Sequence, residues 1–182
     1  MAAGWEIRPE EPGDAGAVLA LDNDAFGPGR HAKSAYRLRE GVQPVSELGF
    51  VAVENAELVG SVRFWPIAVG DASSLLLGPL AVKQGLRGRG IGIDLMRRGI
   101  ERARVLGHAS IILVGDEPYY ARVGFAKLPR GSVRFPGPVD PARILGLGLQ
   151  KEALENLRGD VRRARIDDPV CAAGAAVAPA KV

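Results

Sequence analysis

Apolar residues along the chain fall into short runs, and glycine, proline and charged residues separate them. Residues 5–8 alternate between apolar and polar side chains, which predicts a short first strand. A helix is expected over 15–26, with Asp14 as its N-cap, because its apolar residues recur at helical spacing. The Gly-Pro-Gly break at 27–29 ends this helix. A second helix, with a weaker pattern, is expected over 32–40.

The middle of the chain carries the longest apolar runs, which predict the centre of a sheet. Residues 50–53 and 58–67 are typical of an antiparallel hairpin. The next strand, 75–82, is interrupted by Gly78 and Pro79. Because proline cannot donate a hydrogen bond to a neighbouring strand, a bulge or a local opening of the sheet is expected there.

The second half alternates helices and strands. An amphipathic helix is expected over 91–106, and Gly107 ends it. Residues 110–114 are almost entirely apolar, which is typical of a buried parallel strand. The further elements expected are a short helix over 119–123, a strand from 125, a strand over 143–150 and a short helix over 152–157. The order of elements predicts an α/β fold.

Composition bounds the organisation of the chain. With 182 residues, 47% hydrophobic and 25% charged, it is long enough for one packed domain. We expect that domain over 1–166, followed by a flexible, alanine- and proline-rich tail over 167–182. Cys171 is the only cysteine, so an intrachain disulfide and a cysteine-built metal site are excluded, and it is expected to be an exposed thiol without function.

Charge and hydropathy limit the partners. The net charge of +3 is compatible with an anionic ligand and far below that of a nucleic-acid-binding arm. No apolar run approaches the ~18 residues of a membrane span, and residues 1–13 lack the apolar core of a signal peptide. A cytoplasmic enzyme without nucleic-acid or membrane partners and without a bound metal is therefore expected.

The segment 84–92 joins an apolar strand to the amphipathic helix and reads Gln-Gly-Leu-Arg-Gly-Arg-Gly-Ile-Gly. Glycines let backbone N–H groups approach an anion, and a helix N-terminus adds unpaired donors and a positive dipole end. Arg87 and Arg89 add charge and forked donors for phosphate oxygens. The P-loop tripeptide is absent and the glycine spacing does not fit the dinucleotide fingerprint. A plain glycine-rich turn with two solvated arginines is the alternative.

Two motifs carry a resemblance to a known family. Arg87, Gly90 and Gly92 form Arg-x-x-Gly-x-Gly, which resembles the pyrophosphate-binding motif of the GNAT acetyltransferase superfamily. About thirty residues later, Tyr120 and Gly124-Phe125 resemble the Tyr-x-x-x-Gly-Phe signature of the same superfamily. Preceded by Gly-Asp-x-x-Tyr, this version resembles a poorly characterised bacterial subgroup. The order and spacing of the two motifs make the resemblance fairly specific, and it covers about residues 5–150.

The resemblance implies a GNAT fold, with a mixed central sheet of about six or seven strands, splayed near its middle and flanked by helices. It also implies acetyl-coenzyme A as co-substrate. The pantetheine arm is expected to lie as an extra strand against Leu80, Ala81 and Val82. The pyrophosphate is expected on the loop and helix start formed by Arg87, Gly88, Arg89, Gly90, Ile91 and Gly92.

The activity implied is N-acetyl transfer to a primary amine by direct attack in a ternary complex. Tyr120 occupies the position of the acid that protonates the departing thiolate, and the N–H of Leu80 is a candidate donor to the oxyanion. A core tyrosine is the alternative for Tyr120, and Tyr119 is an ordinary aromatic or a contact of the acyl end. The acceptor is a small-molecule or peptide amine, and a homodimer is compatible with the sequence.

The general base is where the sequence departs from the family. Many relatives carry a glutamate on the central strand, whereas residues 75–82 contain no acid. The candidates left open are Asp116, Glu117, Asp22, Asp24 and His31, besides a water-mediated base or capture of neutral amine. His108 is assigned no role. Asp22, Asp24 and Glu40 hint that a cationic amine is attracted.

The missing strand carboxylate keeps two other functions open. One is a catalytically degenerate acyl-coenzyme A-binding or regulatory protein. The other is a nucleotide-binding protein that uses the same loop, although no magnesium-ligand motif accompanies it.

Overall fold

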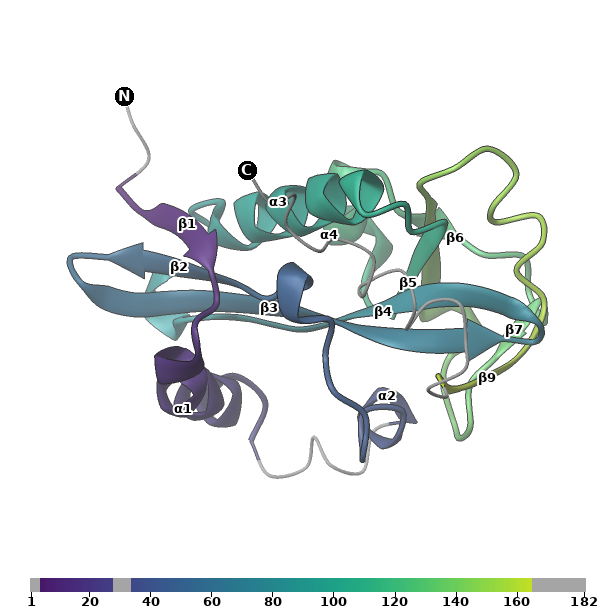
Figure 1. Ribbon diagram of the computed structural model, residues 1–182, viewed down its shortest axis with the longest axis horizontal. Helices are drawn as coiled ribbons and strands as arrows, with labels where there is room; N and C mark the ends of the chain where they lie inside the picture. The colour runs from purple at the N-terminus through teal and green to yellow at the C-terminus, as the bar shows by residue number, and fades with distance from the viewer. Residues whose placement is uncertain (1–3, 28–33, 165–182) are drawn as a thin grey trace, which may run out of the picture.

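A computed structural model describes residues 4–27 and 34–164, and a twisted mixed sheet runs through the molecule (Figure 1). Its main path follows the order β1-β2-β3-β4-β5-β8-β6; the short strand β9 joins it at β3, and β7 pairs with β9. The pairs β4–β5 and β7–β9 are parallel and the other pairs are antiparallel. The His31 position and the segment 167–182 with Cys171 lie outside the described residues.

The elements of the first half are β1 (Glu6–Pro9), η1 (Pro12–Asp14), α1 (Ala15–Phe26), α2 (Ser34–Arg37), η3 (Ser46–Leu48), β2 (Phe50–Glu54), β3 (Glu57–Val69) and β4 (Ala72–Val82). Those of the second half are η4 (Gln84–Leu86), α3 (Ile91–Val105), β5 (Ser110–Val114), α4 (Glu117–Tyr120), η5 (Ala121–Val123), β6 (Ala126–Lys127), β7 (Val133–Arg134), η6 (Pro141–Arg143), β8 (Ile144–Gly148) and β9 (Gly159–Arg163).

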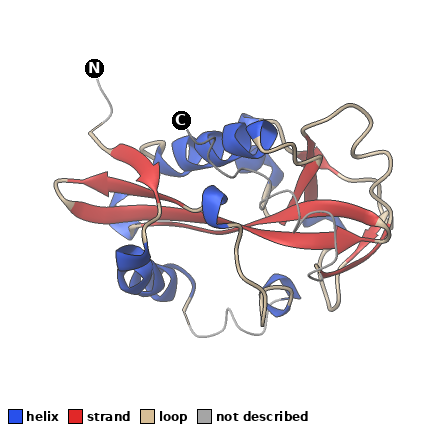
Figure 2. Cartoon of the chain, in the orientation of Figure 1, coloured by secondary structure: helices blue, strands red, loops and turns tan. Residues whose placement is uncertain are grey.

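Helices cover both faces of the sheet, with α3 and α4 on one side and α1 and α2 on the other (Figure 2). The alternation of side chains along the strands divides the core accordingly. Leu75 and Leu77 pack in the cluster beneath α3, while Leu76 between them packs in the opposite cluster with Ile112. α3 contributes its apolar stripe to the first cluster, through Ile91, Ile93, Leu95, Met96, Ile100 and Ala103.

The longer predicted elements are confirmed. α1 has the predicted bounds, β5 has the predicted bounds, and the hairpin of β2 and β3 forms as expected. Asp14 lies at the N-cap position of α1, but its carboxylate accepts a hydrogen bond from Glu11 N (2.8 Å) and pairs with Arg8 instead of capping the helix.

One predicted helix is absent, another is shorter than expected, and one observed strand, β9, was not predicted. The helix expected over 152–157 is a series of turns, in which Glu152 has a φ of +60°. The second helix covers only 34–37 of the described residues. β9 was not predicted because its sequence, Gly-Asp-Val-Arg-Arg, has a single apolar side chain, and its formation depends on pairing with the end of β3.

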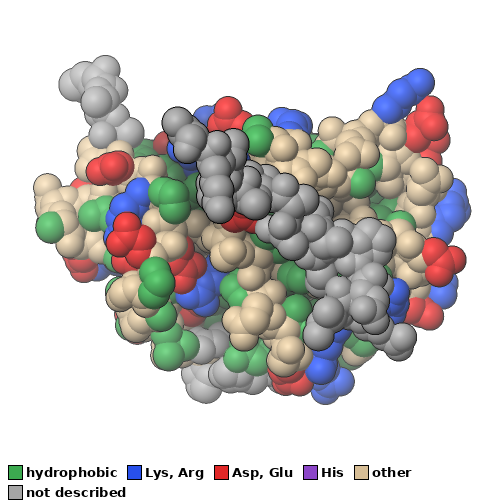
Figure 3. Space-filling model, in the orientation of Figure 1, with side chains coloured by type: hydrophobic (Ala, Val, Ile, Leu, Met, Phe, Trp, Pro, Cys, Tyr) green, Lys and Arg blue, Asp and Glu red, His purple; other side chains and the backbone are tan. Residues whose placement is uncertain are grey.

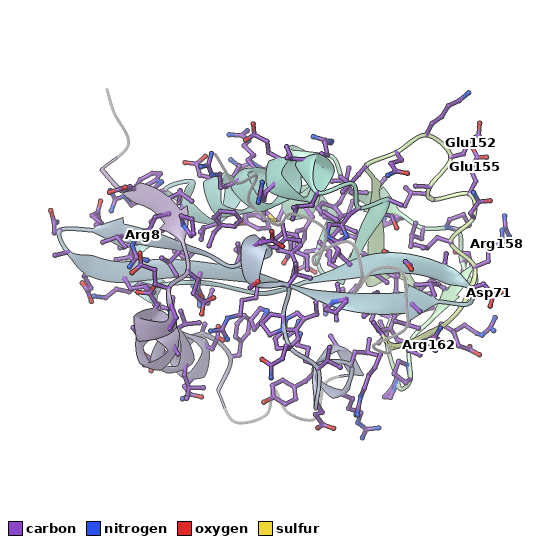
Figure 4. The ribbon with its side chains drawn as sticks, in the orientation of Figure 1. Arg8, Asp71, Glu152, Glu155, Arg158 and Arg162 are labelled. Atoms are coloured by element: carbon purple, nitrogen blue, oxygen red, sulfur yellow. The ribbon has the colours of Figure 1, made fainter. Side chains whose placement is uncertain are left out.

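Surface charges of both signs are interspersed on the face shown in Figure 3. At the end of the sheet near β7 and β9, Glu152, Glu155, Arg158 and Asp71 point outward from their loops (Figure 4). Within the part of the chain that the structure describes, no helix combines the length and apolar character needed to cross a membrane.

Candidate active site

The sheet opens between β4 and β5. These strands pair only at Leu75↔Ile111 and Leu76↔Ile112, whereas β4 stays paired with β3 as far as Val82. Beyond Leu77, one edge of β4 therefore has no neighbouring strand among the described residues. This opening confirms the splay expected from the sequence.

The opening begins at Gly78 and Pro79. Phe64 of β3 faces Leu77 and Val62 faces Leu80, so two residues of β4 oppose Arg63 alone. This is the expected bulge. Gly78 has a φ of +124°, which favours glycine, and its carbonyl accepts a hydrogen bond from Trp65 Nε1 (2.7 Å).

The free edge presents the backbone of alternate residues. Lys83 N donates to Val59 O (2.9 Å), so Val59 and Lys83 form a hydrogen-bonded pair. Hydrogen-bonded and non-hydrogen-bonded pairs alternate along an antiparallel ladder, which turns the backbone groups of Leu80 and Val82 away from β3. Those of Ala81 face β3. An extended ligand at this edge would therefore bond to Leu80 and Val82.

The glycine loop leads from this edge to the start of α3. Gly88 and Gly90 have φ values of +84° and +106°, conformations that suit glycine. The first amides of α3 have no acceptors within the helix and form a positive dipole end. Gly92 is buried, and a Cβ there would lie 2.3 Å from the hydroxyl of Tyr119.

The two arginines of the loop have different surroundings. Arg87 is exposed, and its Nε donates to Val82 O (3.3 Å). Arg89 donates two hydrogen bonds to the Glu54 carboxylate (2.9 and 2.8 Å) and stacks 5.2 Å from the ring centroid of Trp5. Hydrogen bonding from Arg89 lowers the pKa of Glu54. In this structure Arg89 ties the loop to β2 instead of facing the cavity that Arg87 lines.

Two cavities, each of about 340 Å³, lie along the opening. The loop cavity is lined by the glycine loop and by Tyr119. The strand cavity is lined by Gly78 and Pro79 and by residues from α1, the segment after α2 and the loop before β8. Phe26, Leu80 and Tyr120 line both cavities. A ligand that fills the loop cavity can thus meet a second ligand at Leu80 and Tyr120.

Tyr120 is held at this junction by close packing. Its ring lies edge-on to Tyr119 (5.2 Å between centroids) and to Phe125 (6.1 Å). A Cβ on Gly115 would lie 2.2 Å from the ring, so only glycine leaves room for it. Burial, with a smaller contribution from Tyr119, raises the pKa of Tyr120 to about 12. Its hydroxyl therefore keeps its proton at neutral pH.

Several acids expected near the chemistry are engaged elsewhere. Asp116 is exposed and pairs with Arg143 (3.3 Å), and Glu117 pairs with Lys127 (2.7 Å). Asp22 is buried on α1 and Asp24 is exposed. None of these four lines either cavity.

His108 is buried, burial lowers its pKa, and it lines neither cavity. Glu40, which hinted at a cationic amine, pairs with Arg163 (3.2 Å).

The charged lining of the strand cavity could not be predicted from the sequence. Arg39, Asp140 and Arg143 all line it. Asp140 is exposed and accepts a hydrogen bond from Ala142 N (2.9 Å) at the start of η6. These residues stand outside any motif, so only the fold shows that they meet. Over 4–27 and 34–164, no group of three or more His, Cys, Asp or Glu is arranged to hold a metal ion.

Known proteins are similar to this chain in sequence and in fold. The sequence model of the Acetyltransferase (GNAT) family matches residues 16–128. The uncharacterised N-acetyltransferase YhbS of Escherichia coli K12 is 30% identical over 156 residues, which cover 84% of this chain and 92% of that protein. A second E. coli K12 relative, the uncharacterised N-acetyltransferase YjhQ, is 31% identical over 129 residues, covering 69% of this chain and 71% of its own.

Two crystal structures of similar chains contain the coenzyme. The structure of E. coli YhbS in complex with CoA superposes with a TM-score of 0.76 at 28% identity, covering 90% of this chain and 92% of that one. A GNAT acetyltransferase from Brucella melitensis in complex with acetyl-CoA gives a TM-score of 0.67 at 27% identity, covering 88% and 96%.

Proposed function

The chain belongs to the acetyltransferase (GNAT) family, and from that premise we propose that it moves an acetyl group from acetyl-coenzyme A directly to a primary amine. The observation that carries this proposal is the pair of cavities that meet at Leu80 and Tyr120. Along the opening in the sheet, each substrate has its own cavity, and the two cavities meet at Leu80 and Tyr120. The crystal structures of YhbS with CoA and of the Brucella protein with acetyl-CoA support the assignment of the coenzyme to this fold.

The coenzyme is assigned to the free edge of β4 and the loop cavity. The amides of the pantetheine arm bond to the outward carbonyl of Leu80 and to the outward backbone groups of Val82, while Ala81 contacts the arm without these bonds. The pyrophosphate lies on the amides of Gly88, Gly90, Ile91 and Gly92 at the start of α3, beside Arg87. Arg89 contributes by holding the loop through Glu54.

The thioester then lies at the junction of the cavities, and the amine enters from the strand cavity. The amine attacks the thioester carbonyl, and the N–H of Leu80 is the donor to the oxyanion that forms. As the intermediate collapses, the C–S bond breaks and Tyr120 gives its proton to the thiolate. The ammonium proton leaves through water or through Asp140, the carboxylate that lines the strand cavity among the described residues.

The test is release of free thiol from acetyl-coenzyme A with a panel of primary amines, with mass spectrometry of the acetylated product. We expect thiol release that requires an amine and forms one acetylated amine per thiol. Tight binding of acetyl-coenzyme A without transfer to any amine would instead indicate a coenzyme-binding protein. Transfer through a stable acetylated enzyme would contradict direct attack.

A further inference from the structure

Arg39 is half-buried and lines the strand cavity. It lies two residues after α2, its Nε is buried without a hydrogen-bond partner, and its guanidinium forms no ion pair or hydrogen bond with the residues in 4–27 and 34–164. Burial lowers its pKa to about 10, although Asp22 opposes that shift, so the group stays charged at neutral pH. A charge that is partly removed from water is stabilised when a ligand or a side chain of opposite charge meets it.

The position of Arg39 is fixed by contacts on two sides. Its guanidinium carbon lies 5.9 Å from the ring centroid of Trp65, and the same indole donates to the carbonyl of Gly78. A Cβ on Gly78 would lie 2.8 Å from Nη2 of Arg39. Glycine at this position therefore leaves room for the guanidinium and also allows the positive φ of the backbone in β4. Arg39 is held beside the point where the sheet opens, which is where the thioester is assigned.

The strand cavity around Arg39 has an uneven charge. Arg39 and Arg143 line it against one carboxylate, that of Asp140, and Arg143 already pairs with Asp116. Phe26, Leu77 and Val139 give the cavity an apolar wall. At about 340 Å³ it is at the small end of ligand-binding pockets, which suits a small molecule better than a folded partner.

Building on the proposed function, we propose that the acceptor is a small α-amino acid with an apolar side chain, whose carboxylate binds Arg39. The forked donors of a guanidinium match a carboxylate. In an α-amino acid, one carbon separates the carboxylate from the amine. A carboxylate on Arg39 therefore brings the amine next to Gly78 and Leu80, where it can reach the acetyl group. This assignment reverses the cationic acceptor that the acids Asp22, Asp24 and Glu40 hinted at in the sequence.

The test measures binding of matched acceptors to the protein saturated with coenzyme A, so that no transfer is needed. Isothermal titration compares apolar α-amino acids of increasing size, such as alanine, valine and leucine, with their amides, which keep the amine and lose the carboxylate. We expect at least one amino acid to bind about 10- to 100-fold more tightly than its amide, the range of a charge-assisted contact. Arg39→Gln should remove this preference, and Arg39→Lys, which keeps the charge but not the fork, should retain part of it.

Arg104→Gln, on the exposed face of α3, is the control and should leave the preference unchanged. Equal affinity for acid and amide, a preference that survives Arg39→Gln, or no binding of either series would overturn the proposal. If Arg39→Gln does not fold, the preference for acid over amide is compared between Arg39→Lys and wild type. A preference that is unchanged in Arg39→Lys would overturn the proposal. A carboxylate preference without thiol release would overturn the proposed function and leave the carboxylate site standing. Equal thiol release with amides and acids would overturn the carboxylate site and leave the proposed function standing.

Discussion

At the level of single residues, the adjacent side chains of Tyr119 and Tyr120 have different surroundings in the site. The hydroxyl of Tyr119 lies against Gly92 in the loop cavity, while Tyr120 lines both cavities. Burial raises the pKa of each, and for Tyr120 it reaches about 12. Both hydroxyls are therefore donors at neutral pH, and of the two only Tyr120 lines both cavities, at the junction where we propose that coenzyme and acceptor meet.

We expect Tyr120→Phe to lower turnover by roughly 10²–10⁴-fold, the usual contribution of general acid catalysis, when chemistry limits the rate. The ring stays, so the packing against Phe125 and the affinity for acetyl-coenzyme A should persist. Single-turnover thiol release measures the effect, with Tyr119→Phe as the milder control. A severe Tyr119→Phe and a silent Tyr120→Phe would show that the acid is the other tyrosine.

The position of the Tyr120 ring can be tested without touching its hydroxyl. Gly115→Ala places a methyl 2.2 Å from the present ring position, so the ring must move away from the junction. Turnover should fall at least about tenfold, because small displacements of a catalytic group are costly. Coenzyme affinity, measured by titration, should change little. The control Gly16→Ala has open space around its Cβ, and unchanged turnover in both variants would contradict the packing argument.

At the level of elements, the two arginines of the loop between β4 and α3 have different surroundings, and we expect them to have different roles. Arg87→Ala should weaken the binding of acetyl-coenzyme A by about 1.5–3 kcal/mol if the phosphate contact is made, and by less where solvent screens the contact. It should leave pantetheine analogues without the pyrophosphate almost unaffected. Calorimetric titration of both ligands measures this. Equal weakening for the two ligands would remove the pyrophosphate from the loop.

Arg89→Ala should weaken the coenzyme less than Arg87→Ala, because Arg89 already binds Glu54 and stacks on Trp5. Glu54→Gln tests the same tie from the other side and should resemble Arg89→Ala. If Arg89→Ala is instead the more damaging change and Glu54→Gln tightens binding, Arg89 turns from Glu54 to the phosphates when the ligand arrives.

The link between β1 and α1 should make stability depend on acidity. Arg8 pairs with Asp14 at 2.7 Å, and this hydrogen bonding lowers the pKa of Asp14 from 3.8 to about 2. The stabilisation is complete above pH 3.8 and is lost as the pH falls through about 2. Because the pair is near the surface, we expect about 0.5–1 kcal/mol. Asp14→Asn should flatten the dependence of unfolding free energy on pH in that window, and an unchanged slope would contradict this.

Elements whose apolar residues recur at a regular helical or strand spacing could be predicted from the sequence. α1, α3, β5 and the β2–β3 hairpin carry enough apolar residues at the right spacing to define themselves. The break in β4 was predicted because proline lacks a donor. β9 and the turns over 150–157 were not, since the first depends on pairing with β3 and the second packs Leu157 without a helical period.

At the level of the whole molecule, the site combines residues that lie far apart in the chain. The glycine loop and Tyr120 belong to motifs and could be predicted as site candidates. Arg39 and Asp140 belong to none, and they reach the strand cavity only because the sheet opens between β4 and β5. Their role could not be predicted from a single sequence, because charged residues near helix ends and loops are ordinarily solvated.

The segment 167–182 lies outside the described residues, and its composition still predicts little packing. We expect its removal to leave the melting temperature and the coenzyme affinity nearly unchanged, as measured by calorimetry. Cys171 should react fully with a thiol reagent without loss of coenzyme binding. A drop of many degrees on truncation would show that the segment docks on the domain or on a second copy.

The most direct test of the proposed coenzyme site is a crystal structure of the protein with acetyl-coenzyme A. We expect pantetheine amides bonded to the backbone of Leu80 and Val82, and the pyrophosphate on the first amides of α3. We also expect the thioester sulfur within hydrogen-bond reach of the Tyr120 hydroxyl, with its acetyl group facing the strand cavity. A coenzyme whose thioester lies away from the junction of the two cavities, or whose arm leaves the free edge of β4 empty, would contradict the proposed site.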